Sequence, residues 1–353
     1  MKTPSKISVE KDITIANLIT PDFYKYDSYF EESKHKIFLK SWQFVSHQNQ
    51  INNIIYPFTF LENLIDEPYI IIKDKEIKIL SNICTHRANI LCHKKNDLNT
   101  IQCNYHGRTF DLNGKLKQAP GFKKVKNFPN KTDDLKNIPI KSWNNFIFTS
   151  VSNPINIDGI FNDISNRISN YPFSKLIFDK NKSSTFTIDA HWALYCENYL
   201  EGFHVPFIHK GLNADIDYNN YKIEILDHGV LQYTDNKSPL KYSQILNDNI
   251  YAYYYWIFPN MMFNFYNWGL SINIVEPINK DKTRIKFLSF PIKGLSQPSG
   301  TDSDLDLVEK EDQEVVLSVQ NGIKSHHYNK GRYSATHEVG LHYFHQLIAR
   351  YLD

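Results

Sequence analysis

Two short cysteine–histidine pairs constrain the fold of this chain more than any other feature of the sequence. Cys84 and His86 form the first pair, and Cys103 and His106, followed by Gly107, form the second. One thiolate and one imidazole from each of two loops suit a cluster of two irons, because thiolates stabilise ferric iron and neutral imidazoles raise the potential of the other iron. A structural zinc site more often pairs like ligands, at spacings of about two to five residues. Chance is the remaining alternative, and the two spacings together with Gly107 make it the weaker explanation.

The stretches around both pairs resemble the Rieske [2Fe–2S] domain of ring-hydroxylating-type oxygenases. The residues that carry the resemblance are Cys84-Thr85-His86-Arg87 and Cys103-Asn104-Tyr105-His106-Gly107-Arg108-Thr109-Phe110-Asp111. The resemblance implies that Cys84, His86, Cys103 and His106 bind the cluster.

Neighbouring positions place the resemblance in one branch of that family. Rieske proteins of respiratory chains have a disulfide between the cluster loops, and the corresponding positions here are Asn89 and Tyr105. The resemblance is therefore to the low-potential, oxygenase-type branch. Ala88 stands where the family usually has glycine, and we expect this small residue to be tolerated. Cys92 and Cys196 have no place in the motif and are expected to be buried structural thiols.

A second group of candidate ligands lies between Glu197 and His209. Glu201 and His204 are three residues apart and share one face of a helix. His204 and His209 are five residues apart, which is about 140° around a regular helix, so they converge only if the chain bends between them. Pro206 lies between them and disfavours helix at the residue before it. The pattern indicates half of a metal site.

The third ligand of such a site must come from another segment. Residues 304–321 have the periodicity of a helix, with an apolar stripe at Leu305, Val308, Val315, Val316 and Val319. Asp312 lies at the centre of that stripe, and its neighbours Glu311 and Glu314 are predicted to point away. A carboxylate on an apolar face is costly unless it is paired or bound to a cation. Two histidines and one carboxylate form the facial triad of non-haem Fe(II) enzymes.

Residues 197–209 also resemble the mononuclear iron motif of the same family, and residues 309–320 resemble the stretch that carries its third ligand. The resemblance implies that His204, His209 and Asp312 bind the iron. Glu309 is the alternative third ligand, since it lies at the edge of the stripe.

Glu201 and Asn198 are the candidate catalytic residues. The resemblance implies that Glu201 joins a cluster histidine of one subunit to an iron histidine of its neighbour through hydrogen bonds. Glutamate at this position is typical of choline, glycine betaine and carnitine oxygenase-like enzymes, whereas aromatic-ring dioxygenases usually have aspartate. The structural alternative is a surface glutamate on a helix.

Composition and charge exclude several classes of protein. Hydrophobic residues make up 41% of the 353 residues, which excludes intrinsic disorder. A net charge of +2 provides no basic field for nucleic acid or for an anionic membrane. Residues 249–275 carry no charge, but Pro259, Asn260 and Gly269 interrupt them, so two strands are a better reading than a membrane helix. With no apolar leader at the start, we expect a cytoplasmic protein that binds neither nucleic acid nor membrane.

The distribution of turns and apolar runs predicts an α+β chain in three parts. Residues 1–43 are expected to be a helical segment, with a helix over Phe30 to Trp42, packed on the catalytic domain. Residues 44–150 are expected to form the all-β Rieske domain, and residues 151–353 a catalytic mononuclear iron domain with an antiparallel sheet flanked by helices.

Aromatic residues between Tyr251 and Trp268 are candidates for an aromatic cage that binds a quaternary ammonium group. The candidates are Tyr254, Trp256, Phe263, Phe265, Tyr266 and Trp268. An ordinary β core is an equally good explanation, and the sequence leaves open which alternate set faces the pocket. The histidines at 191, 326, 327, 337, 342 and 345 are expected to be packing or solvent-facing residues.

The two sites together imply a terminal oxygenase with a [2Fe–2S] cluster, a mononuclear Fe(II) and O₂ as co-substrate. The expected reaction on a small organic substrate is hydroxylation, oxidative demethylation or C–N cleavage, with methylated or quaternary amines as candidates. An aromatic-ring hydroxylating oxygenase and a Rieske electron carrier without oxygenase activity are the alternatives. The sequence has no Gly-x-Gly-x-x-Gly fingerprint and no spare four-cysteine set, so a separate NAD(P)H-dependent reductase or ferredoxin is implied. The resemblance implies a homotrimer.

Overall fold

The computed structural model describes residues 6–152, 154–237, 245–246, 249–295 and 301–353. The chain forms two compact units, one of Leu39–Ile155 and the other of the residues up to Phe38 together with Asn156–Asp353. Both units contain antiparallel sheets, and the second adds several helices, so the predicted α+β class is confirmed. The predicted functional domains, residues 1–43, 44–150 and 151–353, stay a prediction.

The unit of Leu39–Ile155 contains only strands and short 3₁₀ turns among its described residues. One sheet has the strand order β1 (Gln43–His47), β10 (Phe146–Thr149) and β9 (Ile140–Trp143). A second sheet has the order β2 (Ile55–Phe60), β3 (Glu67–Lys73), β4 (Ile77–Ser81) and β8 (Asn137–Ile138). A third sheet has the order β5 (Thr100–Gln102), β6 (Thr109–Asp111) and β7 (Leu116–Gln118). Tyr69 to Ile72 are buried on both faces of β3, as expected of a continuous apolar run in a central strand.

The core of this unit includes the two motif cysteines. Cys84 and Cys103 are both 2% exposed, and they pack with Leu91, Ile101 and Phe110 in one apolar cluster. The sheets therefore fix the positions of the two loops that carry the first motif.

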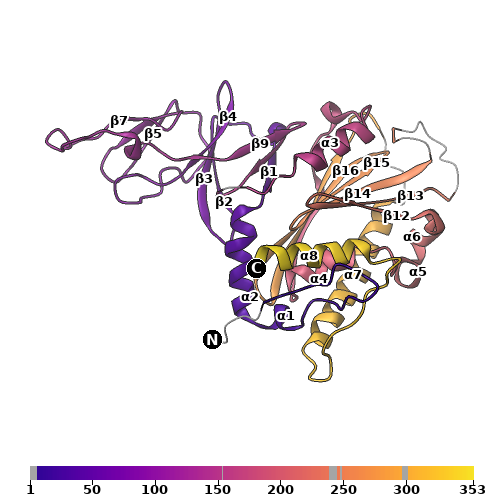
Figure 1. Ribbon diagram of the computed structural model, residues 1–353. Helices are drawn as coiled ribbons and strands as arrows, with labels where there is room; N and C mark the ends of the chain where they lie inside the picture. Colours follow the sequence, from indigo (N-terminus) through magenta and orange to yellow (C-terminus); the bar gives the residue numbers. More distant parts are fainter. Residues whose placement is uncertain (1–5, 153, 238–244, 247–248, 296–300) are drawn as a thin grey trace. The chain divides into compact units, whose positions relative to one another are not determined.

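The larger unit is built on one antiparallel sheet of seven strands (Figure 1). The strand order is β11 (Asp179–Ile188), β17 (Lys282–Pro291), β16 (Gly269–Asn279), β15 (Met261–Tyr266), β14 (Ile250–Ile257), β13 (Gly229–Asp235) and β12 (Lys222–Leu226). The helices α4 (Trp192–Tyr199), α7 (Thr301–Ile323) and α8 (Val339–Leu352) lie on one face of the sheet, and α3 (Asp158–Arg167) lies on the other.

The uncharged stretch 249–275 forms strands, and β14 and β15 are joined near Pro259 as predicted. A third strand, β16, which the two-strand prediction did not include, begins at Gly269. In the part of the chain that the structure describes, none of the helices has both the length and the apolar character to cross a bilayer.

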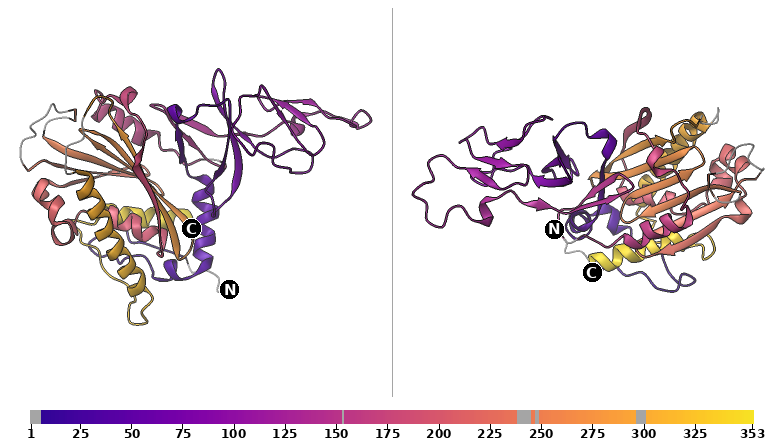
Figure 2. Two further views of the ribbon diagram at one scale, coloured as in Figure 1. Left: turned by 180° about the vertical axis from the view of Figure 1, so that it is seen from behind. Right: turned by 90° about the horizontal axis from the view of Figure 1, so that it is seen from above.

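The N-terminal helix differs from the one that was predicted. The sequence suggested a helix over Phe30 to Trp42, but α2 runs from Asp27 to Lys36, after a short α1 (Asp22–Lys25). Asp27 lies in the first turn of α2, and Lys34, His35 and Lys36 lie in the last, so charges of the favourable sign mark both ends. Lys36 Nζ donates to the carbonyl of Leu352 at 2.6 Å, which ties α2 to the end of α8 (Figure 2).

Helix α4 is the structural support of the second motif. His191 caps it, with its Nδ1 accepting from the backbone N–H of Ala193 at 3.3 Å, and His191 is fully buried against Phe23 and Tyr24. His191 is therefore a core residue, which is one of the two alternatives that the sequence left open. The helix ends at Tyr199, and Leu200 is completely buried at its C-terminus.

Gly340 in α8 allows the close approach of α8 to the end of α4. A Cβ atom at Gly340 would lie 2.7 Å from the carbonyl oxygen of Leu200 and 3.1 Å from Val230 Cγ1. We expect Gly340→Ala to lower the free energy of unfolding by about 1–3 kcal/mol, since backbone cannot yield as a flexible side chain can. Thermal or urea unfolding would measure the loss.

Gly322→Ala is the matched control for this prediction. Gly322 lies in α7 with no atom within 4 Å of its Cβ position. Alanine there is expected to raise stability by about 0.5–1 kcal/mol, because alanine is the better helix former. Equal effects of the two substitutions would show that the contact with Leu200 does not constrain α8.

Candidate functional site

The two loops of the first motif have the same backbone hydrogen bonds. In the first loop, the N–H of Ala88 donates to the carbonyl of Cys84 at 3.1 Å; in the second, Gly107 donates to Cys103 at 3.0 Å. Ala88 and Gly107 have φ angles of 52° and 73°, so both adopt the left-handed conformation. The glycine that the family usually has in place of Ala88 would adopt this conformation without strain, which explains that preference.

The sulfur atoms of Cys84 and Cys103 lie within hydrogen-bonding reach of each other, and both cysteines are free thiols. Burial raises the pKa of Cys84. At Cys103 burial acts in the same direction, but backbone N–H groups of Tyr105 and His106 outweigh it and lower the pKa. Asn89 adds an amide donor 3.6 Å from Cys103 Sγ. Donors aimed at sulfur stabilise thiolates, so these loops fit an iron–sulfur cluster.

The histidines of the two loops lie beside each other, with ring centroids 4.8 Å apart. Partial burial, together with the positive charges of neighbouring His106, Arg108 and Arg87, lowers the pKa of His86. A lowered pKa keeps the imidazole neutral, which is the form that binds a metal. The structure therefore brings the two thiols together and the two imidazoles together.

Arg108 fastens the two loops together. It is 3% exposed, its Nη1 donates to Thr85 Oγ1 at 3.0 Å, and it lies 3.6 Å from a carboxylate oxygen of Asp133. The Thr85 hydroxyl in turn donates to the carbonyl of Asp133 at 2.7 Å. A side chain of the second loop thus holds the residue between Cys84 and His86 in place.

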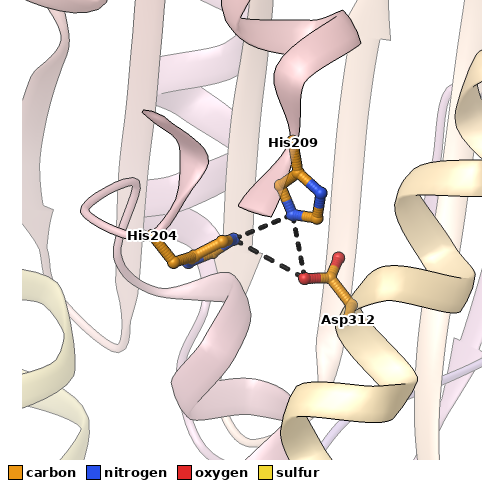
Figure 3. A group of neighbouring side chains, drawn as sticks. All are labelled: His204, His209 and Asp312. Carbon is orange, nitrogen blue, oxygen red and sulfur yellow. Dashed lines mark hydrogen bonds and ion pairs between the residues drawn. The ribbon is translucent and has the colours of Figure 1, made fainter. Parts of the chain in front are cut away.

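The second motif converges on one point in the larger unit (Figure 3). His204 Nε2 and His209 Nε2 are 3.1 Å apart, and Asp312 Oδ1 lies 3.0 Å from His209 Nε2 and 3.5 Å from His204 Nε2. Among the described residues, this is the one group of three or more ligating side chains close enough to hold a single ion. Three ligands at right angles around an ion at about 2.1 Å would be separated by about 3.0 Å, so the spacing fits a facial site.

The chemistry of these three side chains also suits a metal cation. Nδ1 of His204 lies 2.6 Å from Glu201 Oε1, and Nδ1 of His209 lies 2.8 Å from Glu311 Oε2. Ionised carboxylates only accept hydrogen bonds, so each neutral imidazole carries its proton on Nδ1 and has a lone pair on Nε2. Two such lone pairs and the carboxylate oxygen of Asp312 then face one another. A divalent metal ion removes their repulsion, so the residues fit an iron site.

The chain path through the motif differs from the predicted one. The sequence suggested that Pro206 bends a helix between the two histidines. Instead, a separate short helix, α5 (Val205–Ile208), has Pro206 in its first turn, with His204 and His209 at its two ends. Proline is well suited to the first turn of a helix because its missing N–H is not needed there. The break in the chain lies earlier, between α4 and His204.

The orientation predicted for Glu311 is wrong. Glu311 was expected to point away from the site, but its carboxylate bonds to Nδ1 of His209. Val319, assigned to the buried stripe of α7, is 43% exposed, whereas Val316 and Gln320 are buried. The face of α7 that is turned toward the site is therefore not the apolar stripe that the sequence indicated. It includes polar side chains that interact with the site. The side chain of Leu305 lies outside the described residues.

Glu311 and Asp312 act on His209 from two sides. Burial lowers the pKa of His209, but hydrogen bonds and negative charge from Asp312 and Glu311 outweigh it and raise the pKa overall. The same carboxylates that attract a proton would strengthen the binding of a metal cation to the imidazole.

A cavity of about 590 Å³ adjoins the three ligands. A row of residues paired directly across the sheet contributes to its lining: Gln232, Tyr254, Asn264, Ser271 and Ser289. On the helix side, α4 contributes Tyr195, Asn198 and Tyr199, and α7 contributes Glu309 and Asp312. The candidate catalytic residues Asn198 and Glu201 both line this cavity.

The structure decides which aromatic residues face the cavity. Tyr254, Tyr266 and Trp268 line it, whereas Trp256, Phe263 and Phe265 are not among the lining residues. Phe265 packs on Tyr171 on the opposite face of the sheet, and Trp256 packs on Phe344 of α8. Three of the six candidate residues therefore line the cavity, and the cage itself stays a prediction.

Tyr195 and Tyr199 were missed by sequence reasoning. They are four residues apart and share one face of α4, a spacing that could have indicated a common environment. Tyr199 donates to Asn264 Oδ1 at 2.6 Å, and Tyr195 donates to Glu309 Oε2 at 2.5 Å. Glu309, the alternative third ligand, is thus held by Tyr195 and is outside the group formed by His204, His209 and Asp312.

Three of the remaining histidines of the C-terminal region pack against other residues, while His326 and His327 are exposed. His342 is buried and bonds to the carbonyl of Glu10, and His345 is buried and bonds to the Tyr333 hydroxyl. His337 stacks on Phe203, with ring centroids 4.8 Å apart.

Glu311→Gln tests the role of the carboxylate behind His209. We expect the affinity for Fe(II) to fall by about tenfold, because glutamine can still accept the hydrogen bond but no longer adds negative charge to the imidazole. Anaerobic titration of the apo site in competition with a chelator would measure the change. Glu314→Gln is the matched control, since Glu314 is exposed on the same helix. Equal affinities of the two variants would show that Glu311 does not support His209.

Comparison with known families assigns both units. Residues 41–129 match the family described as "Rieske [2Fe-2S] domain", and residues 178–353 match "Ring hydroxylating alpha subunit (catalytic domain)". Choline monooxygenase from Arabidopsis thaliana is 28% identical, over 98% of this chain and 86% of that protein. The carnitine monooxygenase oxygenase subunit from Escherichia coli K12 is 26% identical, over 93% of this chain and 92% of that protein.

Solved structures agree on the fold. The quaternary ammonium Rieske monooxygenase CntA, solved with an inhibitor, has a TM-score of 0.78 at 23% identity and covers 98% of this chain and 100% of its own. Naphthalene 1,2-dioxygenase from Rhodococcus sp. has a TM-score of 0.74 at 15% identity and covers 95% of this chain and 94% of its own. Two family models match this chain, one for each unit. The chain belongs to the Rieske non-haem iron oxygenases, with a [2Fe–2S] domain and a ring-hydroxylating alpha-subunit catalytic domain.

Proposed function

We propose that this oxygenase oxidises a small quaternary ammonium compound at a carbon close to its nitrogen. The observation that carries the proposal is an aromatic-lined cavity directly beside His204, His209 and Asp312. Aromatic faces attract quaternary ammonium ions through their quadrupoles. The relatives named as choline and carnitine monooxygenases support the same substrate class.

In this proposal His204, His209 and Asp312 hold ferrous iron, which supplies O₂ activation for the insertion of oxygen into a C–H bond. Glu201 and Glu311 keep the two imidazoles in the tautomer that leaves Nε2 free for the metal. The cavity walls bind and orient the substrate, and Asn198 and Tyr199 provide polar groups in the lining.

The electron path begins in the unit of Leu39–Ile155. Cys84 and Cys103 are proposed to bind one iron of the cluster, and His86 and His106 the other. Residues 44–150 would then serve electron transfer and residues 151–353 oxygenation, with residues 1–43 as a helical segment on the latter.

The proposal extends to the assembly and its partners. Glu201, already bonded to His204, would connect in a homotrimer to a cluster histidine of the next subunit. A separate NAD(P)H-dependent reductase or ferredoxin would supply electrons, because the sequence carries no dinucleotide fingerprint. The cytoplasm would provide that donor, and it keeps thiols reduced, which suits the four free cysteines.

Asp312→Ala separates the oxygenase from a simple electron carrier. Anaerobically purified wild-type protein is expected to contain about three iron and two acid-labile sulfide per chain. The variant should lose about one iron and all substrate oxidation, but keep the reduced cluster's EPR signal, because its ligands lie in the other unit. Substrate oxidation by the variant at the wild-type rate would contradict Asp312 as a ligand.

Substrate-dependent O₂ consumption tests the substrate class. O₂ consumption and product formation would be measured in a single turnover of dithionite-reduced protein. Choline, glycine betaine and carnitine would each be tested as substrates, and naphthalene would be tested as the aromatic alternative. We expect product from at least one quaternary amine, since the cavity contains both aromatic rings and a carboxylate. Product from naphthalene alone would favour an aromatic-ring hydroxylating oxygenase.

A further inference from the structure

Glu309 places a carboxylate in the substrate cavity without joining the metal ligands. It precedes Asp312 by three residues, so the two lie on one side of α7, about 4.5 Å apart along the helix axis. Both residues line the cavity, but the carboxylate of Glu309 bonds to the hydroxyl of Tyr195. A group held at Glu309 is therefore close to the metal site.

The tyrosines around Glu309 keep its carboxylate in an accepting role. Burial raises the pKa of Tyr195 well above its ordinary value, and the negative charge of Glu309 raises it further. The charge of Glu309 also raises the pKa of Tyr199 and Tyr266, after the larger effect of burial. These phenols therefore stay protonated, and Tyr195 remains a donor to Glu309.

The aromatic rings beside Glu309 form a continuous wall. The ring centroids of Tyr254 and Tyr266 are 5.9 Å apart, and Trp268 stacks on Tyr266 at 5.2 Å. All three side chains line the same cavity as Glu309. Aromatic faces and a carboxylate attract the same kind of ligand, a cation with a weakly hydrated apolar surface.

The lysines of the cavity lining are more exposed than Glu309. Among the described residues that line the cavity, the lysines are Lys182 and Lys310, and both are exposed. Glu309 is instead partly buried. The Glu309 carboxylate is therefore better shielded from solvent than either lysine.

We infer that Glu309 is the specificity-determining residue that anchors the positive charge of the substrate. The carboxylate attracts the cationic nitrogen while the aromatic wall contacts its methyl groups, and carbons attached to that nitrogen then lie near the metal. The inference rests on the proposed substrate class and deepens it. It requires the site to prefer a permanent cation to a neutral molecule of the same shape.

A pair of isosteric probes tests this directly. Choline and 3,3-dimethylbutan-1-ol have the same shape, but only choline carries a charge. Binding of each to the iron-loaded holoprotein would be measured without O₂, by calorimetry or by the fluorescence of Trp268 and the other tryptophans. We expect wild-type protein to bind choline at least about tenfold more tightly, and Glu309→Gln to reduce this preference to about threefold or less. Glu314→Gln, on the exposed face of α7, should keep the wild-type preference.

Two results would overturn the inference. A wild-type preference below about threefold would show that no negative group anchors the cation. An undiminished preference in Glu309→Gln would show that another group does so, while leaving the proposed function intact. If wild-type protein binds neither probe, nor any of the quaternary amines used above, the proposed substrate class fails as well.

A second variant guards against a folding defect. If Glu309→Gln loses iron or melts early, Tyr195→Phe removes the hydrogen bond to Glu309 but keeps the carboxylate and the ring. Tyr195→Phe is expected to weaken choline binding by about threefold. The preference for choline over the neutral isostere is expected to remain unchanged. Loss of that preference in Tyr195→Phe would contradict Glu309 as the source of the charge selectivity.

Discussion

The convergence of three electron-pair donors is the constraint on which the larger unit depends. His204, His209 and Asp312 present two imidazole nitrogens and a carboxylate oxygen within 3.5 Å of one another. With both imidazoles neutral these atoms repel, because the carboxylates Glu201 and Glu311 hold the imidazole protons on the far side. The arrangement therefore favours a positive charge between them, and a divalent metal ion would stabilise all three ligands at once.

Carboxylates surround this site at several distances. Asp312 faces the metal position, Glu201 and Glu311 lie behind the histidines, and Glu309 lies in the adjoining cavity. In the proposal each acts on a different group: the metal, an imidazole proton or a substrate cation. Helix α7 supplies three of the four, so a small rotation of that helix would move three carboxylates together.

The first motif shows how far a sequence alone can lead. Cys84, His86, Cys103 and His106 were recognisable because short loops between strands allow few conformations, and the spacing of ligands within such a loop almost fixes their geometry. The structure shows in addition that the two loops have matching hydrogen bonds. It adds the buried Arg108, which ties them together and which no spacing rule indicated.

Local patterns thus determined the ligand types, the strand-rich and helical regions and the family. The tertiary structure decided which side chains of each helix and strand face the site. The orientation of α7 brought Glu311 to His209 and left Val319 exposed, because its partners are polar groups of the site. The covering of one face of the sheet by α4 and α7 placed Tyr254 in the cavity. Alternate residues of a strand are equivalent in sequence, and only packing against another layer makes one face the inside.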